Sequence, residues 1–164
     1  MRKVLIAVAV TIPAAIATVV WTNHNSRVAE FRSARNECQH SIASTVAELA
    51  KAGRRAHERA FTPPPPINDT DPNLFIAIKK VGTDCFGPPL LSGNGDDWQH
   101  FNSQGFIALN AWVSSNMESN VPGTSYEEAL LGGAADYFGT TLSERVHGLP
   151  EPSLWDSVRA LAPG

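Results

Sequence analysis

The first 21 residues constrain this chain most, because a short cationic start is followed by a long apolar run. Arg2 and Lys3 precede the segment from Val4 to Trp21, which is apolar with few exceptions. Positive charge before an apolar segment is typical of an export signal or of a membrane helix whose amino end stays in the cytoplasm. The sequence therefore predicts that the chain lies outside the cytoplasm from about Thr22 onward.

Two fates of this segment stay open. As a helix it would measure roughly 27 Å, close to the ~30 Å hydrocarbon core of a bilayer, with Arg2 and Lys3 at one interface and Trp21 at the other. This favours a retained anchor and a single-pass protein of the inner or plasma membrane. Alternatively, Ala15-Ile16-Ala17 has the small-x-small form of a cleavage site, and cutting after Ala17 would release a secreted protein.

Residues 22–62 predict an amphipathic helical stalk, capped at Asn25 or Ser26, because no Gly or Pro occurs in them before Gly53. A seven-residue repeat gives one seam, formed by Val28, Phe31, Cys38, Ile42, Leu49, Ala52 and Ala56 and interrupted by Arg35, Thr45 and Arg59. The seam fits a helix packed against its own domain, and it also fits a parallel coiled coil that would make a homodimer.

The rest of the chain predicts a spacer and a small domain. Residues 63–67 include four consecutive prolines and predict a stiff extended spacer. Residues 68–164 predict an α-rich extracytoplasmic domain, with an apolar element at 74–81 that suits a helix or a strand. Further helices are expected from Asp96 or Asp97, from Ser125 and from Pro152 or Ser153. The predicted fold class is therefore mainly α.

Two apolar faces are expected to form the core of this domain, because their residues recur at three- and four-residue steps. The first face is Trp98, Phe101, Gly105, Leu109 and Trp112, and the second is Tyr126, Leu130, Ala134, Tyr137, Phe138, Thr141 and Leu142. Gly132-Gly133 would weaken the second helix, which suggests a close helix contact or a kink there.

Cys38 and Cys85 predict a disulfide, since two cysteines exported together meet an oxidising environment. An intrachain bond would close a loop of roughly 48 residues and contribute on the order of 4 kcal/mol. The rival is a symmetric Cys38–Cys38 bridge between two stalks. A catalytic thiol is not expected, because the chain has no Cys-x-x-Cys motif.

Charge is distributed unevenly along the chain. From Ala60 onward there are four basic residues against twelve acidic ones, which excludes nucleic acid as a natural partner of the domain. The basic group of the stalk consists of Lys51, Arg54, Arg55 and Arg59. This group is interpreted as a solvated helix face or as a contact with an anionic surface.

The sequence predicts no catalytic, cofactor-binding or metal-binding residues. The five histidines have no zinc-like spacing with the cysteines. Glu127 and Asp136 would suit the acid and base of a cell-wall polymer hydrolase, but nine residues place them on opposite sides of one helix. Only a break at Gly132-Gly133 would bring them together.

An N-terminal anchor followed by a charged helix resembles the inner-membrane spanins of phage lysis systems. The resemblance covers only the architecture of residues 1–60 and ends at the proline spacer. It implies a bridging or lysis protein as one alternative, with a polymer hydrolase as the other. The first expectation is a membrane-tethered, non-enzymatic accessory or adaptor protein of the cell envelope that binds a protein partner there.

Overall fold

The computed structural model describes residues 2–59, 73–91, 93–116 and 125–161. Within these ranges the chain is mainly helical and has no strand, which confirms the fold class at its coarsest level. The chain divides into two compact units. We call residues 1–33 with 150–164 the terminal unit, and residues 34–149 the bundle unit. The predicted proline spacer at 63–67 lies outside the described residues.

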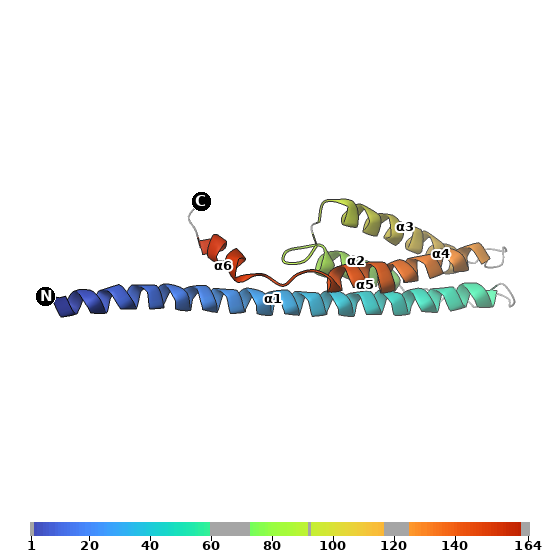
Figure 1. The fold of residues 1–164 in the computed structure, drawn as a ribbon. Coiled ribbons are helices and arrows are strands. Elements are labelled where there is room, and N and C mark those ends of the chain that lie inside the picture. The colour runs from blue at the N-terminus through green and yellow to red at the C-terminus, as the bar shows by residue number, and fades with distance from the viewer. Residues whose placement is uncertain (1, 60–72, 92, 117–124, 162–164) are drawn as a thin grey trace. The chain divides into compact units, whose positions relative to one another are not determined.

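Helix α1 runs from Arg2 to Arg59 without interruption (Figure 1). The predicted start at Asn25 or Ser26 is wrong, and the predicted end of the stalk at residue 62 lies outside the described residues. A residue that suits a helix cap does not end a helix already under way, because each added residue gains a hydrogen bond without a new nucleation cost. Thr22 also fits within the helix, since its hydroxyl donates to the backbone carbonyls of Thr18 and Val19 in the preceding turn, both at 3.0 Å.

The predicted membrane topology needs correction. No helix in the part of the chain that the structure describes is both long enough and apolar enough to cross a bilayer. Along α1 the side chains soon become polar, with His24, Arg27 and Glu30 following Trp21. The side chains of residues 1–16, including Arg2 and Lys3, lie outside those described. The location as a single-pass inner-membrane protein is therefore not supported.

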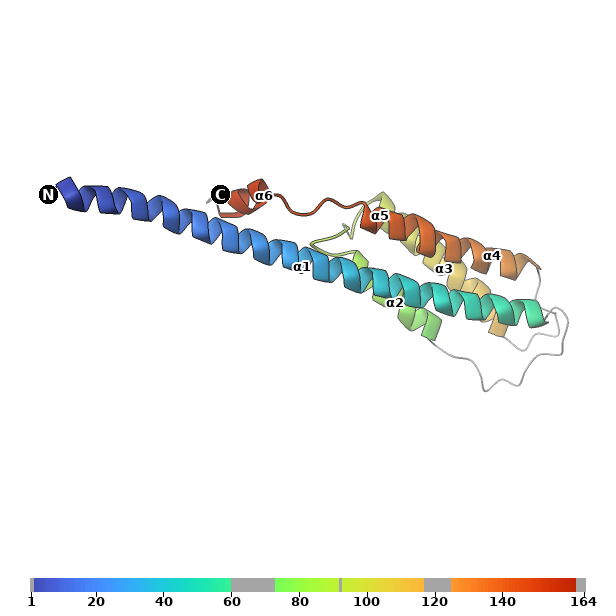
Figure 2. The same cartoon turned by 60° about the horizontal axis from the view of Figure 1, so that its bottom comes forward.

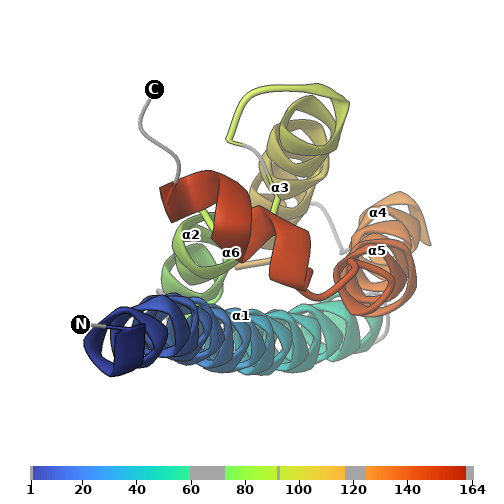
Figure 3. The same ribbon diagram turned by 60° about the vertical axis from the view of Figure 1, so that its left-hand side comes forward.

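The bundle unit packs the second half of α1 with α2 (Asn73–Cys85), α3 (Asp96–Asn116) and α4 (Ser125–Asp136). A π-helical turn, η2 (Tyr137–Leu142), continues α4 into the short α5 (Ser143–His147). Figure 2 shows α2 and α4 on opposite sides of α1, and Figure 3 shows α3 beyond them. One apolar core joins all of these elements.

The α1 seam is buried inside the bundle unit. Cys38, Ile42, Leu49, Ala52 and Ala56 are all almost fully buried. The predicted interruption at Thr45 is also buried, and its hydroxyl donates to the Ser41 carbonyl at 3.0 Å. The seam therefore packs against its own domain, the first of the two alternatives, and over residues 38–56 it is already covered within one chain.

The ambiguous element at 74–81 is helical. Its buried residues, Leu74, Ala77, Ile78, Val81 and Cys85, recur at helical rather than alternating steps. In α3 the buried face is offset from the prediction: Phe101, Gly105, Ala108 and Ala111 are inside, while Trp98, Leu109 and Trp112 are half-buried. A Cβ atom at Gly105 would lie 3.3 Å from Cγ2 of Ile78, so small residues let α2 and α3 approach.

The second predicted face is only partly right. Tyr126 is exposed, and Leu131 rather than Leu130 is buried. Beyond Asp136, η2 adds residues to the turn, so the adjacent Tyr137 and Phe138 both face the core. The close contact expected at Gly132-Gly133 is absent from α4, because no atom lies within 4 Å of a Cβ built on either glycine, and the helix continues past both residues.

Candidate functional site

The two cysteines form an intrachain disulfide in the bundle unit. Their sulfur atoms are 2.10 Å apart, and both residues are fully buried between α1 and α2. The intrachain alternative is thus the one observed, rather than a Cys38–Cys38 bridge. Beside the bond, the Asp84 carboxylate accepts from the Ser41 hydroxyl and from the Lys80 ammonium at 2.6 Å, and this contact raises the pKa of Lys80. The buried disulfide ties α1 to α2 and stabilises the fold.

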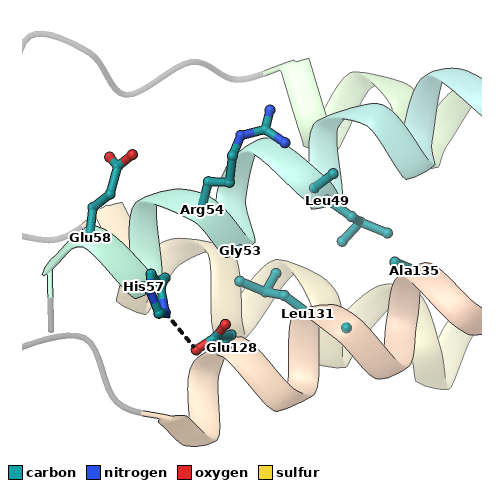
Figure 4. A pocket seen from close by; sticks show the side chains of 10 residues that line it. Leu49, Gly53, Arg54, His57, Glu58, Glu128, Leu131 and Ala135 are labelled. Atoms are coloured by element: carbon teal, nitrogen blue, oxygen red, sulfur yellow. Dashed lines mark hydrogen bonds and ion pairs between the residues drawn. The ribbon is translucent and has the colours of Figure 1, made fainter.

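A groove with a volume of about 490 Å³ lies between α1 and α4, and we call it the α1–α4 groove (Figure 4). Its floor is formed by Leu49 and Leu131, whose side chains point between the two helices. Both leucines are almost fully buried, so the floor is part of the core surface. The lining residues are Leu49, Ala50, Gly53, Arg54, His57, Glu58, Glu128, Leu131, Gly132 and Ala135.

The groove exists because small residues stand where the helices would otherwise fill it. Gly53 on α1 and Gly132 on α4 both line it, and a Cβ atom added to either would meet nothing within 4 Å. Ala50 and Ala135 keep the walls low on each side. Glycine in a helix interior costs about 1 kcal/mol relative to alanine. Gly53 and Gly132 therefore leave an apolar hollow at positions where alanine would make the helices more stable.

Charged side chains of both signs surround the apolar floor. His57 Nδ1 and Glu128 Oε2 lie 3.3 Å apart and join α1 to α4 across one end of the groove. Arg54 and Glu58 project from α1 away from α4, along its outer edge. Among the lining residues there is no hydroxyl or thiol that the His57–Glu128 pair could activate as a nucleophile. The arrangement suits binding of an apolar group with charged neighbours.

The residues of the predicted basic group have different neighbours where the structure describes them. Lys51 pairs with Glu48 at 2.6 Å, Arg54 lines the groove, and Arg55 is half-buried. The side chain of Arg59 lies outside those described. Sequence reasoning missed the groove residues Gly53, His57 and Glu128. The signal that could have found them is the pair of glycines, one in each helix, opposite the buried leucines.

The structure also describes Trp21, Glu127 and Asp136, which the sequence singled out. Trp21 is exposed, and its ring contacts that of His24 with centroids 6.2 Å apart. Glu127 and Asp136 lie on the single unbroken helix α4, so the break that would bring them together is missing. Among the described residues, no cluster of three or more His, Cys, Asp or Glu side chains could hold a metal ion.

A second apolar surface lies over α2 and α3. Phe75, Ile76 and Phe106 are exposed large apolar residues of these helices. Phe75 borders a smaller hollow of about 400 Å³, which Trp98 and Leu109 also line. Lys79 is the charged residue that lines this hollow, whereas several charged residues line the α1–α4 groove.

Comparison with protein families, curated proteins and solved structures finds no match for this chain.

Proposed function

We propose that this protein is a non-enzymatic adaptor whose bundle unit binds a segment of a partner protein in the α1–α4 groove. The observation that carries the proposal is the hollow between α1 and α4, whose floor of buried Leu49 and Leu131 is apolar and continuous with the core. Hollows of this kind receive large apolar anchor residues, which supply most of the binding energy at protein interfaces. Charged neighbours then set orientation more than affinity.

The size and lining of the groove favour an apolar side chain as occupant. Its volume of about 490 Å³ falls within the ~300–1,000 Å³ range of pockets that enclose ligands. Arg54 and Glu58 on the outer edge of α1 place charges of both signs beside the groove. The expected partner segment therefore carries a large apolar residue flanked by charged ones.

A binding role also fits the chemistry better than hydrolysis does. Glycan hydrolysis requires two carboxyl groups about 5–10 Å apart across a cleft. The groove is lined by Glu58 and Glu128, but Glu58 points away from α4 and Glu128 is paired with His57. The disulfide supports a fixed binding surface, since it ties α1 to α2 next to the core that underlies the groove.

The test fills the groove without disturbing the fold. Gly132→Leu places a side chain in the groove, whereas Gly133→Leu places one on the same helix outside it. Neither position has an atom within 4 Å of a built Cβ, so both variants are expected to fold and to gain helix propensity equally. Phage-displayed random peptides selected on the full chain are the probe.

Selected peptides are expected to share a large apolar residue. Gly132→Leu should weaken their binding by about tenfold or more, while Gly133→Leu leaves it unchanged. Thermal unfolding of both variants serves as the folding control. Equal binding to both variants, or selected peptides with no shared apolar residue, would overturn the proposal.

A further inference from the structure

Helix α6 (Leu154–Leu161) of the terminal unit presents its apolar side to solvent. Leu154, Trp155, Val158 and Leu161 are between 37% and 71% exposed, and Trp155 is the most exposed of them. At 100° per residue these four side chains fall within an arc of ~120° and form a single stripe, which we call the α6 face. Ser157, in contrast, is fully buried.

Polar contacts hold α6 in this orientation. The Arg27 guanidinium donates to the Asp156 carbonyl at 2.8 Å, and Arg32 makes two hydrogen bonds to the Glu151 carboxylate at 2.8 and 2.9 Å. Ser153 and Asp156 cap the first turn reciprocally, since the Asp156 N–H donates to the Ser153 hydroxyl at 3.3 Å and the Ser153 N–H donates to the Asp156 carboxylate at 2.9 Å. The helix is thus fastened by its polar side, and its apolar side is left outward.

The terminal unit is also the cationic part of the chain. It contains five basic and three acidic residues, a net charge of +2 that Arg2 and Lys3 supply at the start of the chain, which leaves −5 for the bundle unit. Arg159 stands at the edge of the α6 face, is largely exposed and forms an ion pair with the Asp156 carboxylate at 3.6 Å. Two further apolar residues of this unit, Val19 and Trp21, are exposed on α1. Basic residues beside exposed Trp and Leu are typical of helices that lie on anionic lipid surfaces.

We infer that the α6 face rests on an anionic lipid surface, with Trp155 at the headgroup level and Arg159 beside the phosphates. Trp is favoured at this level because its ring is apolar while its N–H group remains in polar surroundings. The contact lies on the bilayer and requires no helix to cross it. It uses the terminal unit and is independent of the α1–α4 groove.

A lipid surface fits this face better than a second protein does. An α-helix of eight residues is about 12 Å long, so four side chains offer far less than the roughly 800 Å² per partner of a stable protein interface. A bilayer needs no matching shape. The charge of the unit adds attraction to anionic headgroups, each nearby basic residue contributing to it.

The experiment measures whether lipid touches Trp155. The full chain is mixed with vesicles of equal parts phosphatidylglycerol and brominated phosphatidylcholine, and fluorescence quenching is recorded. Subtracting the signal of Trp155→Phe isolates the contribution of Trp155, so lipid contact elsewhere in the chain does not confuse the result. Trp155 is expected to be strongly quenched on these vesicles and weakly on brominated phosphatidylcholine without phosphatidylglycerol.

Two variants that change the net charge by the same amount test whether the position of the charge matters. Arg159→Gln and Ala160→Glu each lower the net charge by one, but position 160 lies on the far side of α6 from the α6 face. We expect Arg159→Gln to weaken quenching on the anionic vesicles by about threefold or more, and Ala160→Glu to have a smaller effect. Absent quenching of Trp155 would overturn the inference. So would a concentration-dependent blue shift of Trp155 without lipid, which would show a second copy covering the face.

Discussion

The two units of this protein place their apolar side chains in opposite ways. In the bundle unit, apolar residues from α1, α2, α3 and α4 meet in one core, and the cysteines lie inside it. In the terminal unit, α6 is held by arginine contacts and a serine cap, and its apolar residues face solvent. The comparison shows that a helix with a clear apolar stripe need not turn it inward.

This difference sets where stability should reside. Burial of apolar area contributes about 25 cal/mol per Å², whereas exposed ion pairs contribute ~0–1 kcal/mol. Substitutions in the bundle unit should therefore lower the global free energy of unfolding. Substitutions in the terminal unit should act locally, on α6 and its contacts.

Phe138→Ala should have the largest effect on the bundle unit. Phe138 is fully buried, and its ring contacts those of Phe101 and Tyr137 edge-on. Truncating a buried Phe costs about 3–5 kcal/mol, because transfer energy is lost and a cavity remains. Urea unfolding measures this loss. Trp155→Ala in α6 is the matched aromatic control and should change the free energy by less than about 0.5 kcal/mol. A similar cost for both would mean that the α6 face is covered in solution.

Removing the disulfide should have the next largest effect. Cys38→Ala with Cys85→Ala opens a loop whose ends are 47 residues apart, and the lost constraint on the unfolded chain is about 4 kcal/mol by chain-entropy arithmetic, with 2–4 kcal/mol typical. The urea midpoint of the double variant should fall accordingly. Because the bond is buried, dithiothreitol should reduce it slowly in the folded wild type and quickly in urea. Rapid reduction without urea would contradict the burial.

High pH should weaken the bundle unit through Tyr137. Burial, followed by the charge of Asp97, raises the pKa of its hydroxyl to about 12. In the unfolded chain the group ionises near its ordinary value of about 10, so the unfolded state gains from ionisation first. Stability is therefore intact below about pH 10 and falls as the pH rises toward about 12. Urea midpoints across this range should show the fall in the wild type and a smaller one in Tyr137→Phe.

How much of this could be predicted from the sequence depends on how local each signal is. The helix starts at Asp96 and Ser125 and the short helix after Ser153 follow from capping residues next to them, and the predictions were close. The pairing of Cys38 with Cys85 needed only the choice between one chain and two. These features depend on a few neighbouring residues or on the two cysteines alone.

The features that were missed depend on distant parts of the chain. The α1–α4 groove requires Gly53 and Gly132 to line the same hollow, which no local pattern reports. The buried face of α4 differs from the prediction, since Leu131 is buried and Tyr126 is exposed, and which face is buried depends on the helices packed against α4. The single helix α1 was divided in prediction because Asn25 and Ser26 suit a helix cap, although they also fit within a helix.

Ser153→Ala should have the smallest effect and should confine it to the terminal unit. Hydrogen bonds from the Ser153 hydroxyl and then from its backbone N–H lower the pKa of Asp156, aided by Arg159 and Arg27. Because the pKa of Asp156 is lower in the folded protein, the unfolded chain takes up the proton more readily as the pH falls. The cap therefore stabilises α6 fully at pH values above the ordinary Asp pKa of about 3.9. This stabilisation is lost as the pH falls through the pKa that Asp156 has in the folded protein.

In Ser153→Ala, carbon NMR titration should find the pKa of Asp156 closer to its ordinary value. Amide hydrogen exchange in α6 should become about fivefold faster, as expected for the loss of a helix cap. Exchange in α3 in the same sample is the internal control and should not change. If exchange accelerated equally in α3, the stability of the two units would be coupled, and the contrast between a core that holds the bundle unit and polar contacts that hold α6 would fail.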